Sequence, residues 1–178
     1  MIATLGLVAF VVVVLTSRST PQPQRTFPDT PPPTLRVGTV APNFSLAALQ
    51  GGSDVQLSRL RGSPVVLNFF ASWCPDCQAE LSAIATFART ENGRIHVVGV
   101  DTNDSNRRAA LQLLERAHAS YAVGVDPVAK VASRYLIEAL PVTYFIDSRG
   151  LVAGVAFGQL TDADLNSWLG RLESGGQT

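Results

Sequence analysis

The stretch Val65-Val66-Leu67-Asn68-Phe69-Phe70-Ala71-Ser72-Trp73-Cys74-Pro75-Asp76-Cys77 decides the fold of this chain. Residues 65–71 are mostly apolar, β-branched or aromatic, which predicts a short buried β-strand. Residues 78–89 are rich in Ala and Leu and predict a helix. Pro75 suits the first turn of that helix, where a missing N–H costs nothing. The sequence therefore places Cys74 at a helix N-terminus and Cys77 almost one turn inside the helix.

This spacing gives the two cysteines a predictable chemistry. Residues three apart on a helix are neighbours, so the two sulfurs can bond with little backbone movement. Unpaired N–H groups and the positive end of the helix dipole favour the thiolate of Cys74, which is the nucleophile in disulfide exchange. Pro75 removes one donor and Asp76 adds a negative charge, so both limit this effect. The pattern predicts that Cys74 attacks a partner's disulfide and that Cys77 resolves the mixed disulfide.

Two other uses of the cysteines are less favoured. A static bridge across so few residues would close a very small loop and gain little chain entropy. A zinc site needs about four protein ligands. The chain has only two cysteines, and its two histidines, His96 and His118, are distant from them in the sequence. We expect both histidines to be structural.

The composition indicates one globular domain. The chain has 178 residues, no net formal charge and 46% hydrophobic residues. This length and hydrophobic content suit a single domain with a true core. The neutral balance gives no reason to expect nucleic acid as a partner.

The two ends of the chain differ from this domain. Residues 1–16 are almost wholly apolar and predict a signal peptide or a short membrane anchor, although a spanning helix needs about 20 residues. Residues 17–36 are rich in proline and predict a disordered linker. We expect the folded domain over 37–173 and a flexible tail over 174–178. An anchor would place the domain on the extracytoplasmic side of a cell membrane, and cleavage would make the domain a secreted protein.

Strand and helix patterns alternate through the domain. An N-terminal β-hairpin is expected around residues 43–57, with its turn at 50–53. Further strands are expected at 65–71, 95–100, 121–125, 142–147 and 151–157, and helices at 75–89, 106–119, 127–135 and 161–172. Asp101 and Asp104 are candidate caps for the second helix. This order predicts an α/β fold with a mixed sheet and helices on both faces.

Residues 68–77 resemble the active-site segment of thioredoxin-like proteins. The resemblance is strongest to the membrane-anchored, extracytoplasmic thiol–disulfide oxidoreductases of the TlpA, ResA and CcmG-like kind. It covers about residues 37–172 and includes Leu140-Pro141-Val142-Thr143. It implies a thioredoxin-like fold with an N-terminal hairpin and a central βα insertion at about 101–125.

The resemblance also implies roles for residues outside the cysteine pair. Pro141 would be a cis-proline against the cysteines, and the backbone of Leu140 would pair with an incoming peptide. Trp73, Pro75 and Asp76 would complete the substrate-binding surface. Glu80, three residues beyond Cys77, would border the site and assist proton transfer. The residues alone leave two alternatives open, a trans proline at 141 and a solvated helix charge at 80.

The function expected from this resemblance is a thiol–disulfide oxidoreductase, a reductase by preference and possibly one of cytochrome c maturation. It would need no dissociable cofactor and would act on dithiol or disulfide partner proteins as a monomeric domain. A disulfide-forming oxidase would use the same residues. A thiol peroxidase is disfavoured because Ala71 stands where a threonine is expected. A Cu(I)-binding module would lack a third sulfur or a nearby histidine.

Overall fold

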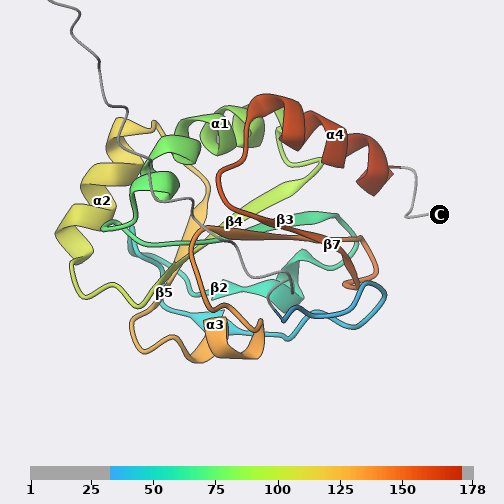
Figure 1. Cartoon of the computed structure of the whole chain (residues 1–178), viewed down its shortest axis with the longest axis horizontal. Coiled ribbons are helices and arrows are strands. Elements are labelled where there is room, and N and C mark those ends of the chain that lie inside the picture. The colour runs from blue at the N-terminus through green and yellow to red at the C-terminus, as the bar shows by residue number, and fades with distance from the viewer. Residues whose placement is uncertain (1–32, 174–178) are drawn as a thin grey trace, which may run out of the picture. The chain divides into compact units, whose positions relative to one another are not determined.

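The computed structural model describes residues 33–173, and their elements follow the predicted order (Figure 1). The expected anchor, most of the expected linker and the expected tail lie outside the described residues. The strands are β1 (Ser45–Leu46), β2 (Val55–Gln56), β3 (Val65–Phe70), β4 (His96–Thr102), β5 (Ala122–Asp126), β6 (Val142–Ile146) and β7 (Val152–Phe157). The α-helices are α1 (Pro75–Glu91), α2 (Arg107–Arg116), α3 (Lys130–Arg134) and α4 (Asp162–Glu173). No helix within 33–173 is long and apolar enough to span a membrane.

The strands form the predicted mixed sheet and the predicted hairpin. The five-stranded sheet has the order β5-β4-β3-β6-β7, and β1 pairs with β2 in a separate antiparallel hairpin. β3 runs parallel to β4 and antiparallel to β6, so the strand before the cysteines is central in the sheet. All six residues of β3 are buried, as expected for its apolar sequence.

Helices cover both faces of the sheet. α1 and α4 lie together on one face, and α3 lies on the other (Figure 1). Side chains alternate along a strand, so β3 contributes Val66 and Phe70 to the core under α1, and Leu67 and Phe69 to the core beside α3 and the hairpin. The predicted α/β architecture is confirmed.

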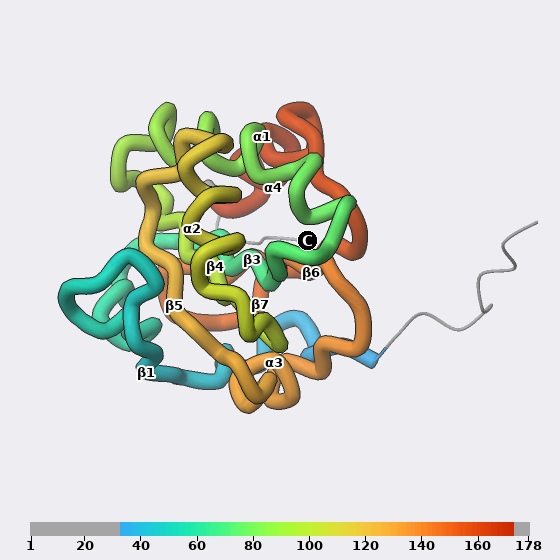
Figure 2. The backbone as a smooth tube through the Cα atoms, turned by 90° about the vertical axis from the view of Figure 1, so that its left-hand side faces the viewer, coloured from blue at the N-terminus to red at the C-terminus, as the bar shows by residue number. Residues whose placement is uncertain are grey.

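The N-terminal hairpin continues onto the edge of the sheet at β5. Leu49 N–H donates to Val123 O at 2.8 Å, and Val125 N–H donates to Ala47 O at 3.0 Å. Figure 2 shows β1 beside β5. The close approach needs a glycine, because a Cβ at Gly124 would lie 2.7 Å from the Cβ of Leu46. The segment after β1 thus covers an edge that would otherwise be open to pairing.

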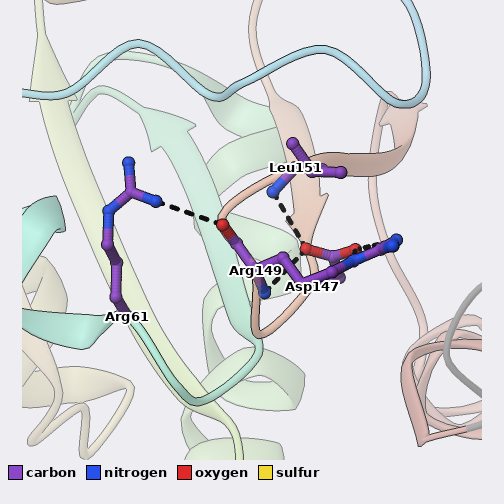
Figure 3. Close-up of polar contacts among 4 residues, drawn as sticks. All are labelled: Arg61, Asp147, Arg149 and Leu151. Carbon is purple, nitrogen blue, oxygen red and sulfur yellow. Dashed lines mark hydrogen bonds and ion pairs between the residues drawn. The ribbon is translucent and has the colours of Figure 1, made fainter.

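A carboxylate organises the turn between β6 and β7 (Figure 3). Asp147 accepts hydrogen bonds from the backbone N–H groups of Arg149 and Leu151, both at 2.9 Å, and from the Arg149 guanidinium. Arg61 donates to the carbonyl of Arg149 from the segment before β3. Burial raises the pKa of Asp147, but these donors outweigh it and lower the pKa overall. This turn lies at the end of β6 opposite Pro141.

Three predicted details are wrong. Asn106 caps α2 through a 3.1 Å hydrogen bond from Ala109 N–H, in place of the expected Asp101 or Asp104. The helix expected over 127–135 is confined to Lys130–Arg134, because Ala129 before it has a positive φ of 53°; Asp126 accepts N–H groups of its first turn. His118 lies beyond the end of α2 with a positive φ of 51°, so it is not a helical residue.

Candidate functional site

Cys74 and Cys77 form a disulfide at the N-terminus of α1, with Cα atoms 5.3 Å apart. Cys74 is the N-cap residue, Pro75 is the first helical residue, and Asp76 lies in the first turn. The backbone N–H of Cys77 donates to Cys74 Sγ at 3.2 Å. The predicted placement of the pair is therefore confirmed, and an N–H group of the helix terminus is directed at the first sulfur.

The two cysteines differ in accessibility. Cys77 has no exposed surface, and Cys74 retains 4%. The residues around Cys74 are open: Trp73 is 56% exposed, and Pro75 and Asp76 are both exposed. A reagent or partner therefore meets the Trp73–Asp76 surface and Cys74 before it meets Cys77.

Glu80 is fully buried one turn beyond Cys77, so the alternative of a solvated helix charge is wrong. Asn68 Nδ2 donates to its Oε1 at 2.8 Å, and Leu160 N–H donates to its Oε2 at 2.9 Å. The pKa of Glu80 is raised from 4.5 to about 7 overall, because burial and, to a smaller extent, the charge of Asp76 outweigh the lowering by these two hydrogen bonds. A carboxyl group with this pKa can exchange a proton near neutral pH.

The sequence did not predict the partners of Glu80. Asn68 also donates to Thr143 Oγ1 at 3.0 Å, and its own Oδ1 has no hydrogen-bond partner among the described residues. If the amide is turned over, that oxygen can accept a hydrogen bond from the protonated acid, so Asn68 can pair with either protonation state of Glu80. The one available signal in the sequence was Asn68 itself, a single amide in an otherwise apolar strand, which indicated a buried polar contact.

The Leu140–Pro141 peptide bond is cis, as expected from the resemblance. Pro141 directly precedes β6, and the pairing of Val142 with Phe69 places it at the end of the sheet from which the chain leads to Cys74. Pro141 O accepts a hydrogen bond from Gly158 N–H at 3.0 Å. The trans alternative is wrong, and Pro141 lies at the same end of the sheet as the disulfide.

A groove of about 150 Å³ begins at Trp73 and extends to Leu140. Its remaining lining comes from the end of β4 and from the segment around α3, namely Thr102, Asn103, Ala129, Ala132, Ile137, Glu138 and Ala139. The indole Nε1 of Trp73 donates to Asn103 O at 3.1 Å. The structure thus brings together at one groove two residues, Trp73 and Leu140, that lie far apart in the sequence.

The histidines lie apart from this groove, His96 on β4 and His118 after α2. Within residues 33–173, no group of three or more His, Cys, Asp or Glu side chains is placed to hold a metal ion.

Comparisons with known proteins agree with this geometry. A model of the AhpC/TSA family matches residues 37–155. The chain is 36% identical over 143 residues to the thiol:disulfide interchange protein DsbE of Xylella fastidiosa, which covers 79% of this chain and 71% of the relative. It is 33% identical over 138 residues to the thiol-disulfide oxidoreductase ResA of Oceanobacillus iheyensis, which covers 75% of this chain and 71% of the relative.

The fold comparison gives the same result. A crystal structure of a Chlorobium tepidum protein, assigned as a thiol:disulfide interchange protein DsbE, matches with a TM-score of 0.71 and 27% identity, covering 81% of this chain and all of the other. The predicted thioredoxin-like fold is confirmed.

Proposed function

We propose that this chain, a thiol–disulfide oxidoreductase that belongs to the AhpC/TSA family, reduces disulfides of partner proteins outside the cytoplasm. The observation that carries the proposal is the disulfide at the start of α1, with Cys77 N–H directed at Cys74 Sγ. An N–H group in this position stabilises a thiolate better than a thiol. Cys74 is therefore the attacking residue, and the buried Cys77 is the resolving residue.

The proposed reaction has two exchange steps. In the reduced protein, the Cys74 thiolate attacks one sulfur of the partner's disulfide, and the other partner sulfur leaves as a thiolate that takes up a proton. Cys77 then loses its proton and attacks Cys74 Sγ, which releases the partner's second thiolate. Two electrons pass to the partner, and the Cys74–Cys77 disulfide forms. A donor dithiol must reduce it again.

Glu80 is the proposed acceptor for the proton of Cys77. It lies on the same face of α1 one turn further on, and both residues are fully buried. Its pKa of about 7 allows it to accept a proton at neutral pH and to release it afterwards. A solvated carboxylate with a pKa near 4.5 would be a much weaker base for a thiol.

The partner is proposed to bind along the groove that runs from Trp73 to Leu140. Pro75 and Asp76 are exposed just beyond Trp73 in the chain, and Leu140 lines the groove, where its backbone would pair with an extended peptide segment of the partner. A bound segment would bring its disulfide to Cys74, the less buried sulfur.

The setting of the reaction is proposed from the resemblance and from the sequence ends. Residues 1–16 would anchor the chain or direct its export, residues 17–36 would be a spacer, and residues 174–178 would be a tail to the domain at 37–173. The likeness to proteins named DsbE and ResA supports thiol–disulfide exchange. The extracytoplasmic location and the reductase role in cytochrome c maturation are proposed from the resemblance of residues 68–77.

Replacing Cys77 with alanine in the native host tests the proposal. The variant should accumulate mixed disulfides through Cys74, because the resolving thiol is gone, and mass spectrometry would identify the partners. A Cys74→Ala, Cys77→Ala double variant is the matched control and should trap nothing. Absence of trapped partners from the single variant would contradict the proposed reaction.

The direction of electron flow needs a separate measurement. Equilibration of the Cys74–Cys77 pair with glutathione buffers gives its reduction potential, and a tenfold change in the equilibrium corresponds to about 30 mV. A potential near about −270 mV would support the reductase, and one near about −120 mV would indicate a disulfide-forming oxidase.

A further inference from the structure

Two buried carboxyl groups lie beside the segment that leads into the disulfide. Asp101 is 1% exposed and Asp104 is 4% exposed. Asp101 pairs with Phe70 across β3 and β4, so its side chain lies on the sheet face that α1 covers. The residues of the β4–α2 loop, 103–106, follow directly. Neither carboxyl group has a part in the exchange reaction described above.

Asp104 holds two parts of the chain together. Its Oδ2 accepts the backbone N–H of Ser72 at 2.7 Å, and its Oδ1 accepts the backbone N–H of Asn106 at 2.8 Å. Since Ser72 precedes Trp73, these contacts fasten the residues just before the disulfide to the start of α2.

The same loop holds Trp73 by a second contact. Asn103 adopts a positive φ of 51°, and its carbonyl accepts the indole N–H of Trp73 at 3.1 Å. The ring of Trp73 is more than half exposed, and an exposed indole would otherwise be free to change rotamer. The loop therefore fixes one wall of the groove that ends at Leu140.

Asp101 and Asp104 have pKa values shifted in opposite directions. Burial raises the pKa of Asp101 to about 7, and the nearby charge of Asp104 and the hydrogen bond between the two carboxyl groups raise it as well. Burial also acts to raise the pKa of Asp104, but hydrogen bonds from Ser72, Asn106 and Asp101 together lower it. Asp104 is therefore the more acidic of the two carboxyl groups and the ionised acceptor for the backbone donors.

We propose that Asp104 is a positioning residue for partner recognition: it fixes Ser72 directly and holds the loop whose Asn103 carbonyl binds Trp73, and so sets the shape of the groove between Trp73 and Leu140. This inference rests on the proposed binding of partners along that groove. The inference concerns binding and not the exchange chemistry. Asp104 affects the binding of protein substrates through the placement of Trp73, whereas a small disulfide reaches Cys74 without using the groove.

The test compares two variants with the same chemical change. In Asp104→Asn one acceptor oxygen is replaced by an NH₂ donor, so the hydrogen bond from either Ser72 N–H or Asn106 N–H is lost. Asp147→Asn makes the same change in the β6–β7 turn at the opposite end of the sheet, where Asp147 also accepts two backbone N–H groups (Figure 3). Both carboxyl groups are buried and both have a lowered pKa, so the two variants should lose similar stability.

The readout is the reaction of the fully reduced protein with insulin and with the small disulfide 5,5′-dithiobis(2-nitrobenzoate), under single-turnover conditions. For Asp104→Asn we expect the insulin concentration at half-maximal rate to rise about tenfold, as for the loss of a charge-assisted hydrogen bond. The maximal rate and the rate with the small disulfide should stay within about twofold of the parent. Asp147→Asn should match the parent in all three quantities.

The inference would be overturned if the two variants had the same half-saturating insulin concentration. It would also be overturned if Asp104→Asn slowed the reactions with insulin and with the small disulfide by the same factor. If Asp104→Asn does not fold, Trp73→Phe tests the same placement, since it removes the indole N–H and keeps an aromatic ring. It should raise the half-saturating insulin concentration by a larger factor than it lowers the rate with the small disulfide, and equal factors would overturn the inference. The assay starts from reduced protein, so its outcome is independent of whether the chain is a reductase or an oxidase in the cell.

Discussion

Replacing Glu80 with glutamine should make the protein more stable above neutral pH and should remove part of its pH dependence. Glutamine has the shape of the protonated acid. Its oxygen can accept Leu160 N–H, and its amide can donate to Oδ1 of Asn68 once the Asn68 amide is turned over. The variant therefore keeps the contacts of neutral Glu80 and cannot ionise.

The magnitude follows from the raised pKa. Burial raises the pKa of Glu80 from 4.5 to about 7, so between these values the folded protein binds a proton that the unfolded chain releases. The parent should lose stability as the pH rises through this window, by about 3 kcal/mol at about 1.4 kcal/mol for each pH unit. This contribution is fully present below pH 4.5 and is lost as the pH rises through about 7.

Urea denaturation of the oxidised parent and of Glu80→Gln at pH 4.5, 6 and 8 measures this difference. The free energy of unfolding of the variant minus that of the parent should increase by about 3 kcal/mol between pH 4.5 and pH 8. Asp101 also titrates near pH 7, but it is present in both proteins and cancels in the comparison. A difference that stays constant over this range would show that Glu80 ionises freely and would refute the reasoning.

Two further substitutions test the scaffold. Gly124→Ala should lower the free energy of unfolding by about 1–3 kcal/mol, because its Cβ would lie 2.7 Å from the Cβ of Leu46. Thermal unfolding measures the loss, and an unchanged melting temperature would show that the hairpin can move away. Asp126→Ala should lower the free energy of unfolding by about 2–3 kcal/mol, since it leaves the buried N–H groups of Val131 and Ala132 without their acceptor. Urea titration measures this loss, and a loss below about 0.5 kcal/mol would show that another acceptor replaces the carboxylate.

The local part of this structure could be predicted from sequence because short-range patterns determine it. The apolar run before Trp73 is long enough for one buried strand, and Pro75 marks the first turn of the helix. The three-residue spacing of Cys74 and Cys77 then fixes their approach. The order of strands and helices followed from the same patterns, and the sheet followed from that order.

The parts that could not be predicted depend on contacts between distant segments. Whether Glu80 is solvated depends on Leu160, which lies 80 residues further along the chain and covers α1 together with α4. Asp104 is of a residue type that often caps helices, but its partner in the structure, Ser72, is 32 residues away in the sequence. Asn106 outcompetes it as the cap because Asp104 is already engaged. Polar residues in a loop indicate that hydrogen bonds form, but the chain's three-dimensional course decides with which groups.

The dipeptide between the cysteines affects both ends of the proposed reaction. Asp76 lies in the first turn of α1, where a carboxylate is favoured by the helix dipole and opposes a second negative charge at the same terminus. The same charge contributes to the raised pKa of Glu80. A neutral residue at position 76 would therefore ease formation of the Cys74 thiolate and lower the pKa of Glu80 together. The attacking thiol and the proton acceptor of the second step are thus linked through one exposed side chain.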